Sequence, residues 1–445
     1  MFLSRKQPQP TPVRAIVLGG GGSKGAYQVG VWQAIEELDL RFQVVTGTSV
    51  GALNGALMAQ GSFAQAYELW WNLDNSQVVG GVPDLDDHPD SLLEVYRAYI
   101  REAVKNRGAD TTPLQRHIQR ILDEDKLRAS GVEFGVTTVD MTTLKPVQLF
   151  LDQMPPGTVA DYLMASASFF PALRPKAIGD SLYVDGGYYD NIPIDMALAA
   201  HTPVEEVLAV DVDGLGVTRP VKTQVPITTL RSYWDLGSIL VFDNAQIRRN
   251  IRLGYLDGLK AFGRLEGRAY AFRPGTLALL EEEYLDQMTQ AMTVALEGLS
   301  SLTRLSLDKL LADRLTGSLA HRRQVATPRE MLAACAETAA ELLDLDPREI
   351  YTLDTFEDNM LDALAAKKQG EDTLSLEQLR GLALHQVVQG VREKGRELLL
   401  KTVLDNLRQH FSGEEPGIPA EMIALLAPRE FLASLYLLLL ERRTL

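Results

Sequence analysis

The sequence predicts an α/β portion followed by a helical region, and two observations support this prediction. Between residues 13 and 274, short runs rich in β-branched residues alternate with stretches of helical periodicity, which is typical of α/β architecture. After Thr276 these runs disappear, and Leu, Ala, Glu, Arg and Lys recur at helical spacing up to Leu445. We therefore expect an α/β portion over residues 13–275 and an all-α region of unknown role over residues 276–445.

The elements of the α/β portion are expected in the following order. A buried strand over residues 13–18 ends in glycines and leads into a helix over residues 26–38. A second strand over residues 42–45 leads through a turn into a small-residue helix over residues 50–59. Between Gly61 and Thr112 the pattern changes, which predicts an insertion over the sheet's edge that serves as a lid or substrate-entry segment. Later strands are expected over residues 132–139, 147–151 and 207–212.

The composition limits the partners open to the chain. Its 445 residues include 44 Lys and Arg and 59 Asp and Glu, and the resulting charge of −15 repels nucleic-acid backbones. The same charge gives no general attraction to anionic membranes, so membrane contact has to come from apolar surface. One cysteine, Cys335, and six scattered histidines provide neither a cysteine-based zinc cage nor a paired-histidine site. We expect no nucleic-acid partner and no metal.

No segment of the sequence has the pattern of a leader or of a membrane span. The first 12 residues lack the apolar stretch of a signal peptide, and no run of about 18 apolar residues occurs. The leucine-rich stretch Phe431–Leu440 is too short to span and is expected to be buried in the helical region; its alternatives are a membrane surface or a partner helix. The sequence predicts a cytoplasmic protein with peripheral membrane contact at most.

A glycine-rich loop, Gly19–Gly25, lies between the first expected strand and helix. Such a loop places backbone N–H groups at a helix N-terminus, where the helix dipole favours an anion. Gly20, Gly22 and Gly25 match the GxGxxG pattern, but no acidic residue follows the second strand to bind a ribose. The order Lys24-Gly25 also differs from the Gly-Lys-Ser/Thr of a Walker loop. Both nucleotide interpretations fail, which leaves another anion or a purely structural turn.

A second glycine motif follows the second expected strand. Gly47-Thr-Ser49-Val-Gly51 matches GxSxG in the strand–turn–helix setting that the motif requires. Small residues at such a junction also occur simply for close packing. Beside an anion-holding loop, however, the motif indicates a nucleophilic serine next to an oxyanion hole.

A serine nucleophile needs a base, and two candidates follow Ser49 in the chain. His201 completes the order Ser–Asp–His. However, it is expected at the C-terminus of a helix, where a histidine commonly serves only to interact with the helix dipole. Asp185 ends an expected strand and is followed by Gly186 and Gly187, which suggests a constrained turn carrying a functional group. An Asp-Gly pair is also common in β-turns.

Together these residues resemble the patatin-like phospholipase family. The resemblance covers residues 13–212 well and extends to about residue 275. Three motifs and two further stretches carry it: Gly20–Gly25, Gly47–Gly51, Asp185–Gly187, Ala165–Ala172 and Asn191–Pro193.

The resemblance implies a three-layer fold with a mainly parallel central sheet and a serine–aspartate dyad. Ser49 would be the nucleophile and Asp185 its base, with no metal or organic cofactor. The backbone amides of Gly20, Gly21 and Gly22 would form the oxyanion hole. The supporting residues would be Lys24, Gly25, Gly47, Gly51, Gly186 and Gly187.

The function that follows from this resemblance is hydrolysis of lipid carboxylic esters, as in a phospholipase A, lysophospholipase or esterase. A transacylase or thioesterase would use the same dyad, and a non-catalytic lipid-binding module would not need it. The oligomeric state cannot be read from the sequence. Six apolar side chains are candidates to line an acyl channel, with ordinary core packing as their alternative: Trp70, Trp71, Val78, Val79, Phe169 and Phe170.

Overall fold

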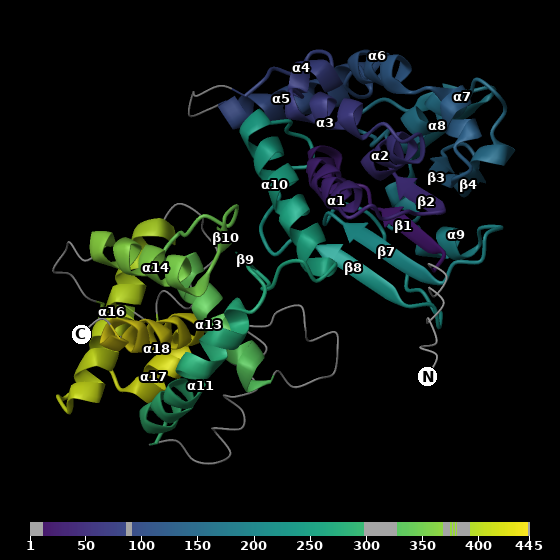
Figure 1. Ribbon diagram of the computed structural model, residues 1–445. Helices are drawn as coiled ribbons and strands as arrows, with labels where there is room; N and C mark the ends of the chain where they lie inside the picture. The colour runs from purple at the N-terminus through teal and green to yellow at the C-terminus, as the bar shows by residue number, and fades with distance from the viewer. Residues whose placement is uncertain are drawn as a thin grey trace, which may run out of the picture. The chain divides into compact units, whose positions relative to one another are not determined.

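The computed structural model describes residues 12–85, 91–297, 327–367, 374–375, 377–378, 380 and 392–443. The chain divides into two compact units, Met1–Phe262 and Gly263–Leu445, which Figure 1 shows in purple-to-teal and teal-to-yellow. Residues 263–275, which the sequence analysis grouped with the α/β portion, belong to the second unit by their contacts. Part of the insertion at 86–90 lies outside the described residues, as do His88, His321 and His385.

The first unit is built on a mainly parallel sheet, as predicted. Its strands are β1 (Arg14–Leu18), β2 (Val44–Thr48), β3 (Glu133–Asp140), β4 (Lys145–Phe150), β5 (Lys176–Ile178), β6 (Ser181–Asp185), β7 (Glu206–Asp211) and β8 (Ile227–Arg231). Their order is β5-β6-β3-β2-β1-β7-β8, and β4 pairs with β3. Strands β3, β2, β1, β7 and β8 are parallel, whereas β4, β5 and β6 are antiparallel to their neighbours.

Helices cover both faces of this sheet, because side chains of β1 alternate between two apolar cores. Ile16 and Leu18 face the core formed with α1 and α2, and Ala15 and Val17 face the core beside α9. Figure 1 shows these layers, which confirm the predicted three-layer α/β fold. The helices of this unit are α1 (Ala26–Glu37), α2 (Val50–Ala59), α3 (Phe63–Trp71), α4 (Asn75–Val78), α5 (Ser91–Asn106), α6 (Thr112–Ile121), α7 (Glu124–Ala129), α8 (Val159–Ser166), α9 (Ile194–Leu198) and α10 (Asn244–Ala261), with 3-10 turns η1 (Gly22–Gly25), η2 (Leu151–Gln153) and η3 (Gly186–Tyr188).

The described part of the second unit is mainly helical, as predicted. It contains α11 (Thr276–Ala295), α13 (Pro328–Leu342), α14 (Leu353–Lys367), α16 (Arg392–Ser412), α17 (Ala420–Leu426) and α18 (Pro428–Arg443), and a parallel pair of short strands, β9 (Ala271–Phe272) and β10 (Ile350–Tyr351), that the sequence analysis missed. Every residue of Phe431–Leu440 is buried, because α18 packs against the other five helices. The leucine-rich stretch is therefore core, as expected. None of the described helices is long and apolar enough to cross a membrane.

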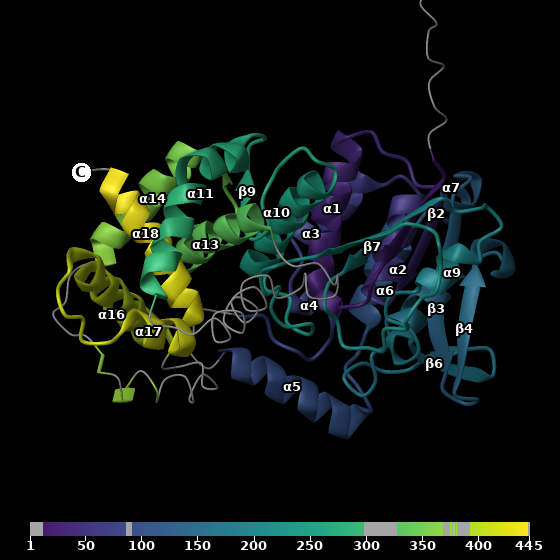
Figure 2. The same cartoon turned by 90° about the horizontal axis from the view of Figure 1, so that it is seen from below.

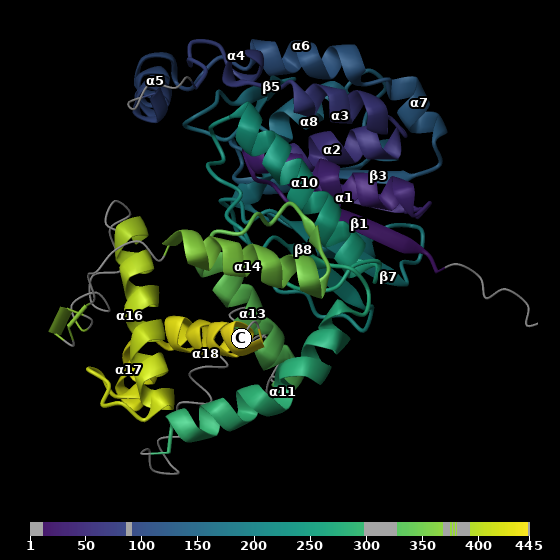
Figure 3. The same cartoon turned by 60° about the vertical axis from the view of Figure 1, so that its left-hand side comes forward.

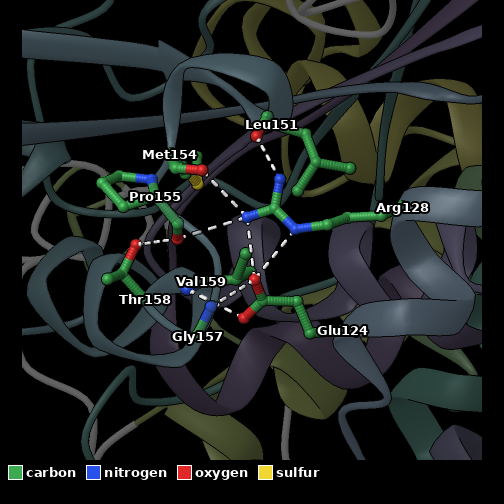
Figure 4. Close-up of polar contacts among 8 residues, drawn as sticks. All are labelled: Glu124, Arg128, Leu151, Met154, Pro155, Gly157, Thr158 and Val159. Atoms are coloured by element: carbon green, nitrogen blue, oxygen red, sulfur yellow. Dashed lines mark hydrogen bonds and ion pairs between the residues drawn. The ribbon is translucent and has the colours of Figure 1, made fainter.

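A pair of charged residues on α7 holds the loop that leads into α8. Arg128 forms an ion pair with Glu124 at 2.8 Å and donates to three backbone carbonyl oxygens of the loop. Glu124 in turn accepts two backbone N–H groups at the start of α8. Figure 4 shows these contacts, which involve Leu151, Met154, Pro155, Gly157 and Val159. The clamp sets the position of α8, whose last residue contacts the candidate site.

Replacing Arg128 by Lys should lower the free energy of unfolding of the first unit by about 1–3 kcal/mol, because an ammonium cannot reproduce the guanidinium fork that reaches several acceptors at once. All four tryptophans (Trp32, Trp70, Trp71 and Trp234) lie in this unit, so their fluorescence during urea unfolding reports on it alone. Arg41→Lys, at an exposed pair with Asp39, should change the value by less than about 0.5 kcal/mol and serves as the control. Equal effects of both substitutions would contradict the clamp.

Candidate active site

Ser49 lies at the turn between β2 and α2 with an unusual backbone conformation. Its φ of 56° and ψ of −129° place a non-glycine residue in a sparsely populated region, which costs free energy and is typical of functional turns. The turn requires glycine at position 51, because a Cβ there would lie 2.0 Å from the carbonyl oxygen of Leu18. A Cβ on Gly47 would in turn meet the backbone of Gly51 at 2.4 Å. The two glycines of the motif thus let the strained turn form.

Ser166, at the end of α8, fixes the backbone of this turn. Its hydroxyl oxygen accepts the N–H of Ser49 at 2.8 Å, and the same hydroxyl donates to the carbonyl of Thr137 at 2.7 Å. Beside it, the Thr48 hydroxyl donates to the carbonyl of Asp190 at 2.8 Å. Ser166 was noted in the sequence only as part of a resembling stretch, and no spacing in the sequence points to this role.

Asp185 reaches Ser49 because β6 runs antiparallel to β3. It pairs with Thr138 near the carboxyl end of β3, and the chain then crosses Thr137 at Gly186, where a Cβ would lie 2.1 Å from a carbonyl oxygen. Hydrogen bonding by the Ser49 side chain lowers the pKa of the Asp185 carboxyl, as does the N–H of Gly187, which donates to Asp185 Oδ1 at 2.8 Å. Burial raises the pKa of Asp185 to about 6, against the lowering effect of these two hydrogen bonds.

The backbone N–H groups of the glycine loop differ in whether they have an acceptor within the protein. The N–H of Gly20 donates to the carbonyl of Asn191 at 3.1 Å, and the Asn191 side chain donates back to the carbonyl of Gly20 at 3.2 Å. Gly21 and Gly22 line the same cavity as Ser49, and their N–H groups have no acceptor among the described residues. Gly22 has a φ of 56°, and a Cβ there would lie 1.9 Å from a backbone oxygen.

Lys24 and Gly25 support the loop rather than the cavity. The Lys24 ammonium donates to the carbonyl of Asp213 at 3.0 Å, which ties the loop to the segment after β7. A Cβ on Gly25 would contact Val50 at 2.5 Å and Trp70 at 3.0 Å, so a glycine allows α1 to approach α2.

A buried polar network holds the loop from the helix side. Gln28 donates to the carbonyl of Gly19 at 2.6 Å, and Asn54 donates to the carbonyl of Gly25 at 3.1 Å and to Gln28 at 2.9 Å. The indole N–H of Trp70 completes the network by donating to Asn54 at 2.9 Å. Because a half-satisfied buried network is costly, these side chains together specify one loop geometry. No motif in the sequence points to Gln28 or Asn54.

An apolar cavity opens beside Ser49 and Asp185. The insertion predicted after Gly61 supplies part of its wall through α3, α4 and α5. Of the six proposed channel residues, four line the cavity: Trp70, Val78, Val79 and Phe169. Trp71 does not; it stacks on Tyr67 at 5.5 Å and lies under the guanidinium of Arg248. Phe170 is absent from the lining as well.

A polar side chain in this cavity wall is also unpaired. The hydroxyl of Tyr99, on α5, is buried and has no hydrogen-bond partner among the described residues. Burial raises the pKa of Tyr99, so the hydroxyl stays protonated. Such a group is available to a bound molecule.

His201 lies at the opposite edge of the sheet from Ser49. Its backbone N–H and ring Nδ1 contact the carboxylate of Glu133, at 2.6 and 2.9 Å, at the amino end of β3. Ser49 follows the carboxyl end of β2, where Thr48 pairs with Thr137. The rise along a strand separates these two ends by roughly 13 Å. The structure therefore brings Asp185 to Ser49 and leaves His201 apart.

A family model matches the part of the chain that contains this arrangement. Residues 16–198 match the model described as patatin-like phospholipase, a range that contains the glycine loop, Ser49 and Asp185. Residues 16–198 are therefore similar to the patatin-like phospholipase family, and they are called the patatin-like domain below.

Curated relatives of this patatin-like domain are much longer proteins. Patatin-like phospholipase domain-containing protein 7 of Rattus norvegicus is 29% identical over 204 residues, which cover 44% of this chain and 13% of that protein. Lysophospholipase NTE1 of Mycosarcoma maydis is 26% identical over 226 residues, which cover 50% of this chain and 10% of that protein. The chain thus matches only a small part of these relatives' length.

Two solved structures align with most of this chain at low identity and low TM-score. VipD from Legionella pneumophila is 14% identical, with a TM-score of 0.36, over 95% of this chain and 92% of that one. ExoU from Pseudomonas aeruginosa, solved in complex with SpcU, is 18% identical, with a TM-score of 0.34, over 95% of this chain and 85% of that one.

Replacing Asp185 by Asn in the patatin-like domain should stabilise the protein at pH 8. The folded state binds the Asp185 proton more tightly than the unfolded state does. The wild-type protein therefore loses stability as the pH rises from 3.8 to about 6, because the buried carboxyl has to ionise. A shift of about 2 pKa units corresponds to about 2–3 kcal/mol at pH 8, and the difference should shrink towards pH 4. Urea unfolding followed by tryptophan fluorescence measures it. Asp180→Asn, in an exposed turn, is the control and should change stability by less than about 0.5 kcal/mol. A loss of stability in the Asp185→Asn variant at pH 8 would contradict the buried charge.

Proposed function

We propose that the patatin-like domain hydrolyses carboxylic ester bonds of lipids through a Ser49–Asp185 dyad. The observation that carries the proposal is that Ser49 and the buried carboxylate of Asp185 line the same apolar cavity, where the Ser49 side chain lowers the pKa of that carboxyl. The names of the relatives, a patatin-like phospholipase and a lysophospholipase, support the same substrate class. Asp185 is the base in this proposal because its carboxylate lies in the same cavity as Ser49, and its raised pKa makes it a stronger base than an exposed aspartate.

In the first half of the reaction, the Asp185 carboxylate accepts the hydroxyl proton while Ser49 Oγ attacks the ester carbonyl carbon. The oxygen of the tetrahedral intermediate takes negative charge and accepts hydrogen bonds from the amides of Gly21 and Gly22. The N-terminal end of α1, which follows this loop directly, adds its dipole. The Gly20 N–H already donates to the carbonyl of Asn191, so it serves to position the loop.

Collapse of the intermediate breaks the bond to the alcohol oxygen. Asp185 returns its proton to this leaving alkoxide, and an acyl group remains esterified to Ser49. Water then gives a proton to Asp185 and attacks the acyl carbonyl. When this second tetrahedral intermediate collapses, the bond to Ser49 Oγ breaks, Asp185 returns the proton to that oxygen, and the fatty acid is released. An alcohol in place of water would give transacylation, and product analysis with added glycerol separates the two outcomes.

The apolar cavity accommodates the acyl chain of the substrate. Its walls are mainly leucine, valine and aromatic side chains, which bind a hydrocarbon chain by removing it from water. Because such lipids reside in membranes, the proposal includes peripheral contact with a membrane surface. With a net charge of −15, this contact depends on apolar side chains.

A fluorophosphonate probe should label the wild-type protein and should not label Ser49→Ala, because the probe reacts with an activated serine hydroxyl. Asp185→Asn should lower turnover of a short-chain ester by at least about 100-fold, the usual contribution of a general base. His201→Ala is the matched control and should keep wild-type turnover. Loss of turnover in His201→Ala with retention in Asp185→Asn would refute the dyad, as would a folded wild type that stays unlabelled.

The rate should fall on the acid side of about pH 6, because a protonated Asp185 cannot accept the serine proton. Below this pH, kcat/KM for a soluble ester should drop by about tenfold per pH unit. Burial also raises the pKa of Asp190 to about 6. Asp190→Asn should therefore keep the acid limb; its disappearance in that variant would assign the limb to Asp190.

A further inference from the structure

Helix α5 carries a continuous apolar face that points into solvent. Its members are Leu92 (48% exposed), Leu93 (47%), Tyr96 (38%), Ile100 (64%) and Val104 (78%). Residues three, four or seven apart lie on the same side of a helix, so these five side chains form one stripe along α5, here named the α5 apolar face. No other described element exposes more than two large apolar side chains.

The opposite side of α5 belongs to the catalytic unit. Val95, Ala98 and Tyr99 are buried and pack in the same core cluster as Trp70 and Val50. Tyr99 also lines the cavity that contains Ser49. Figures 2 and 3 show α5 as an outlying helix at the edge of the first unit. A single helix therefore has one side in the wall of the acyl cavity and the other in solvent.

Three basic residues border the α5 apolar face, against two acidic residues on the same helix, Glu94 and Glu102, although the chain as a whole is acidic. Arg97, Arg101 and Lys105 are exposed and follow the stripe along the helix. Arg101 donates to the carbonyl of Gly81 and pairs with Glu102, whereas Arg97 and Lys105 form no ion pair with a described residue. An amphipathic helix with an apolar stripe and a basic border is the pattern of a helix that lies in a membrane interface.

We propose that the α5 apolar face docks the protein on a lipid bilayer that contains anionic headgroups. The apolar stripe enters the acyl region, and Arg97 and Lys105 contact headgroup phosphates. A bilayer fits better than a protein partner because the same helix walls the cavity in which the acyl chain is to bind. The inference rests on the proposed function, since it gives the lipid substrate its point of entry.

The test measures vesicle binding separately from catalysis. The full chain carrying Ser49→Ala, which cannot consume the lipid, is floated with vesicles of phosphatidylcholine and phosphatidylserine. In this background Ile100→Gln with Val104→Gln should weaken partitioning by at least about tenfold, because two exposed aliphatic side chains no longer insert. Gln favours the helix and both positions are exposed, so the fold should be kept.

Two further variants sharpen the test. Leu144→Gln with Leu279→Gln removes side chains that are 79% and 55% exposed elsewhere in the chain, and it should bind vesicles as strongly as its parent. Arg97→Gln with Lys105→Gln should lose the gain in binding that phosphatidylserine gives over phosphatidylcholine alone. With Ser49 intact, the Ile100/Val104 variant should keep hydrolysis of a soluble short-chain ester and lose hydrolysis of vesicle lipid.

Four results would overturn the proposal. Two concern vesicle binding: a parent chain that does not bind, or equal binding by the Ile100/Val104 and control variants. Two concern the Ile100/Val104 variant itself: a fall in its soluble-ester hydrolysis, or a change in the oligomeric state of that variant. The last would identify the face as a contact between copies. Vesicle binding through this face by a chain with no ester hydrolysis would support the docking surface and refute the proposed function.

Discussion

The candidate site depends on the approach of one buried carboxylate, that of Asp185, to Ser49 in a shared cavity. A carboxylate taken out of water is unfavourable unless nearby donors stabilise it, and only Ser49 and the Gly187 amide do so among the described residues. The raised pKa of Asp185 reflects the part of this burial free energy that the two donors do not offset. A base of this kind removes a proton more readily than an exposed aspartate, so the same burial that destabilises the fold suits the proposed chemistry.

The sheet makes this contact by combining two strand directions. Parallel strands β1 and β2 bring the glycine loop and the Ser49 turn to one edge, since the carboxyl ends of parallel strands meet there. The antiparallel strand β6 then delivers Asp185 to that edge from the other side. Supports from outside the sheet hold the turn: the α7 clamp positions α8, and Ser166 of α8 holds the Ser49 amide.

The insertion between α2 and β3 carries a second set of properties. Its helices α3, α4 and α5 supply apolar wall to the cavity, and α5 also has an apolar face in solvent. An apolar stripe exposed to water is unfavourable. Binding to a surface that covers the stripe is therefore favourable, because it removes these side chains from water. In our proposals, the same insertion therefore contacts the membrane and forms part of the wall of the cavity that leads to Ser49.

The sequence by itself determined the elements that depend on local chemistry. Strand and helix periodicity predicted β1, α1, β2 and α2 within a few residues, and the glycine motifs predicted the two turns. The tertiary structure alone decided which residues meet. It placed Asp185 and not His201 beside Ser49, occupied the Gly20 amide with Asn191, and brought Ser166 to Ser49 across 117 positions. The half-exposed edge strand β8 was also missed, since its pattern lacks a buried run. Periodicity reports how a segment divides between core and water, whereas such long-range contacts depend on strand order and direction, which no local pattern encodes.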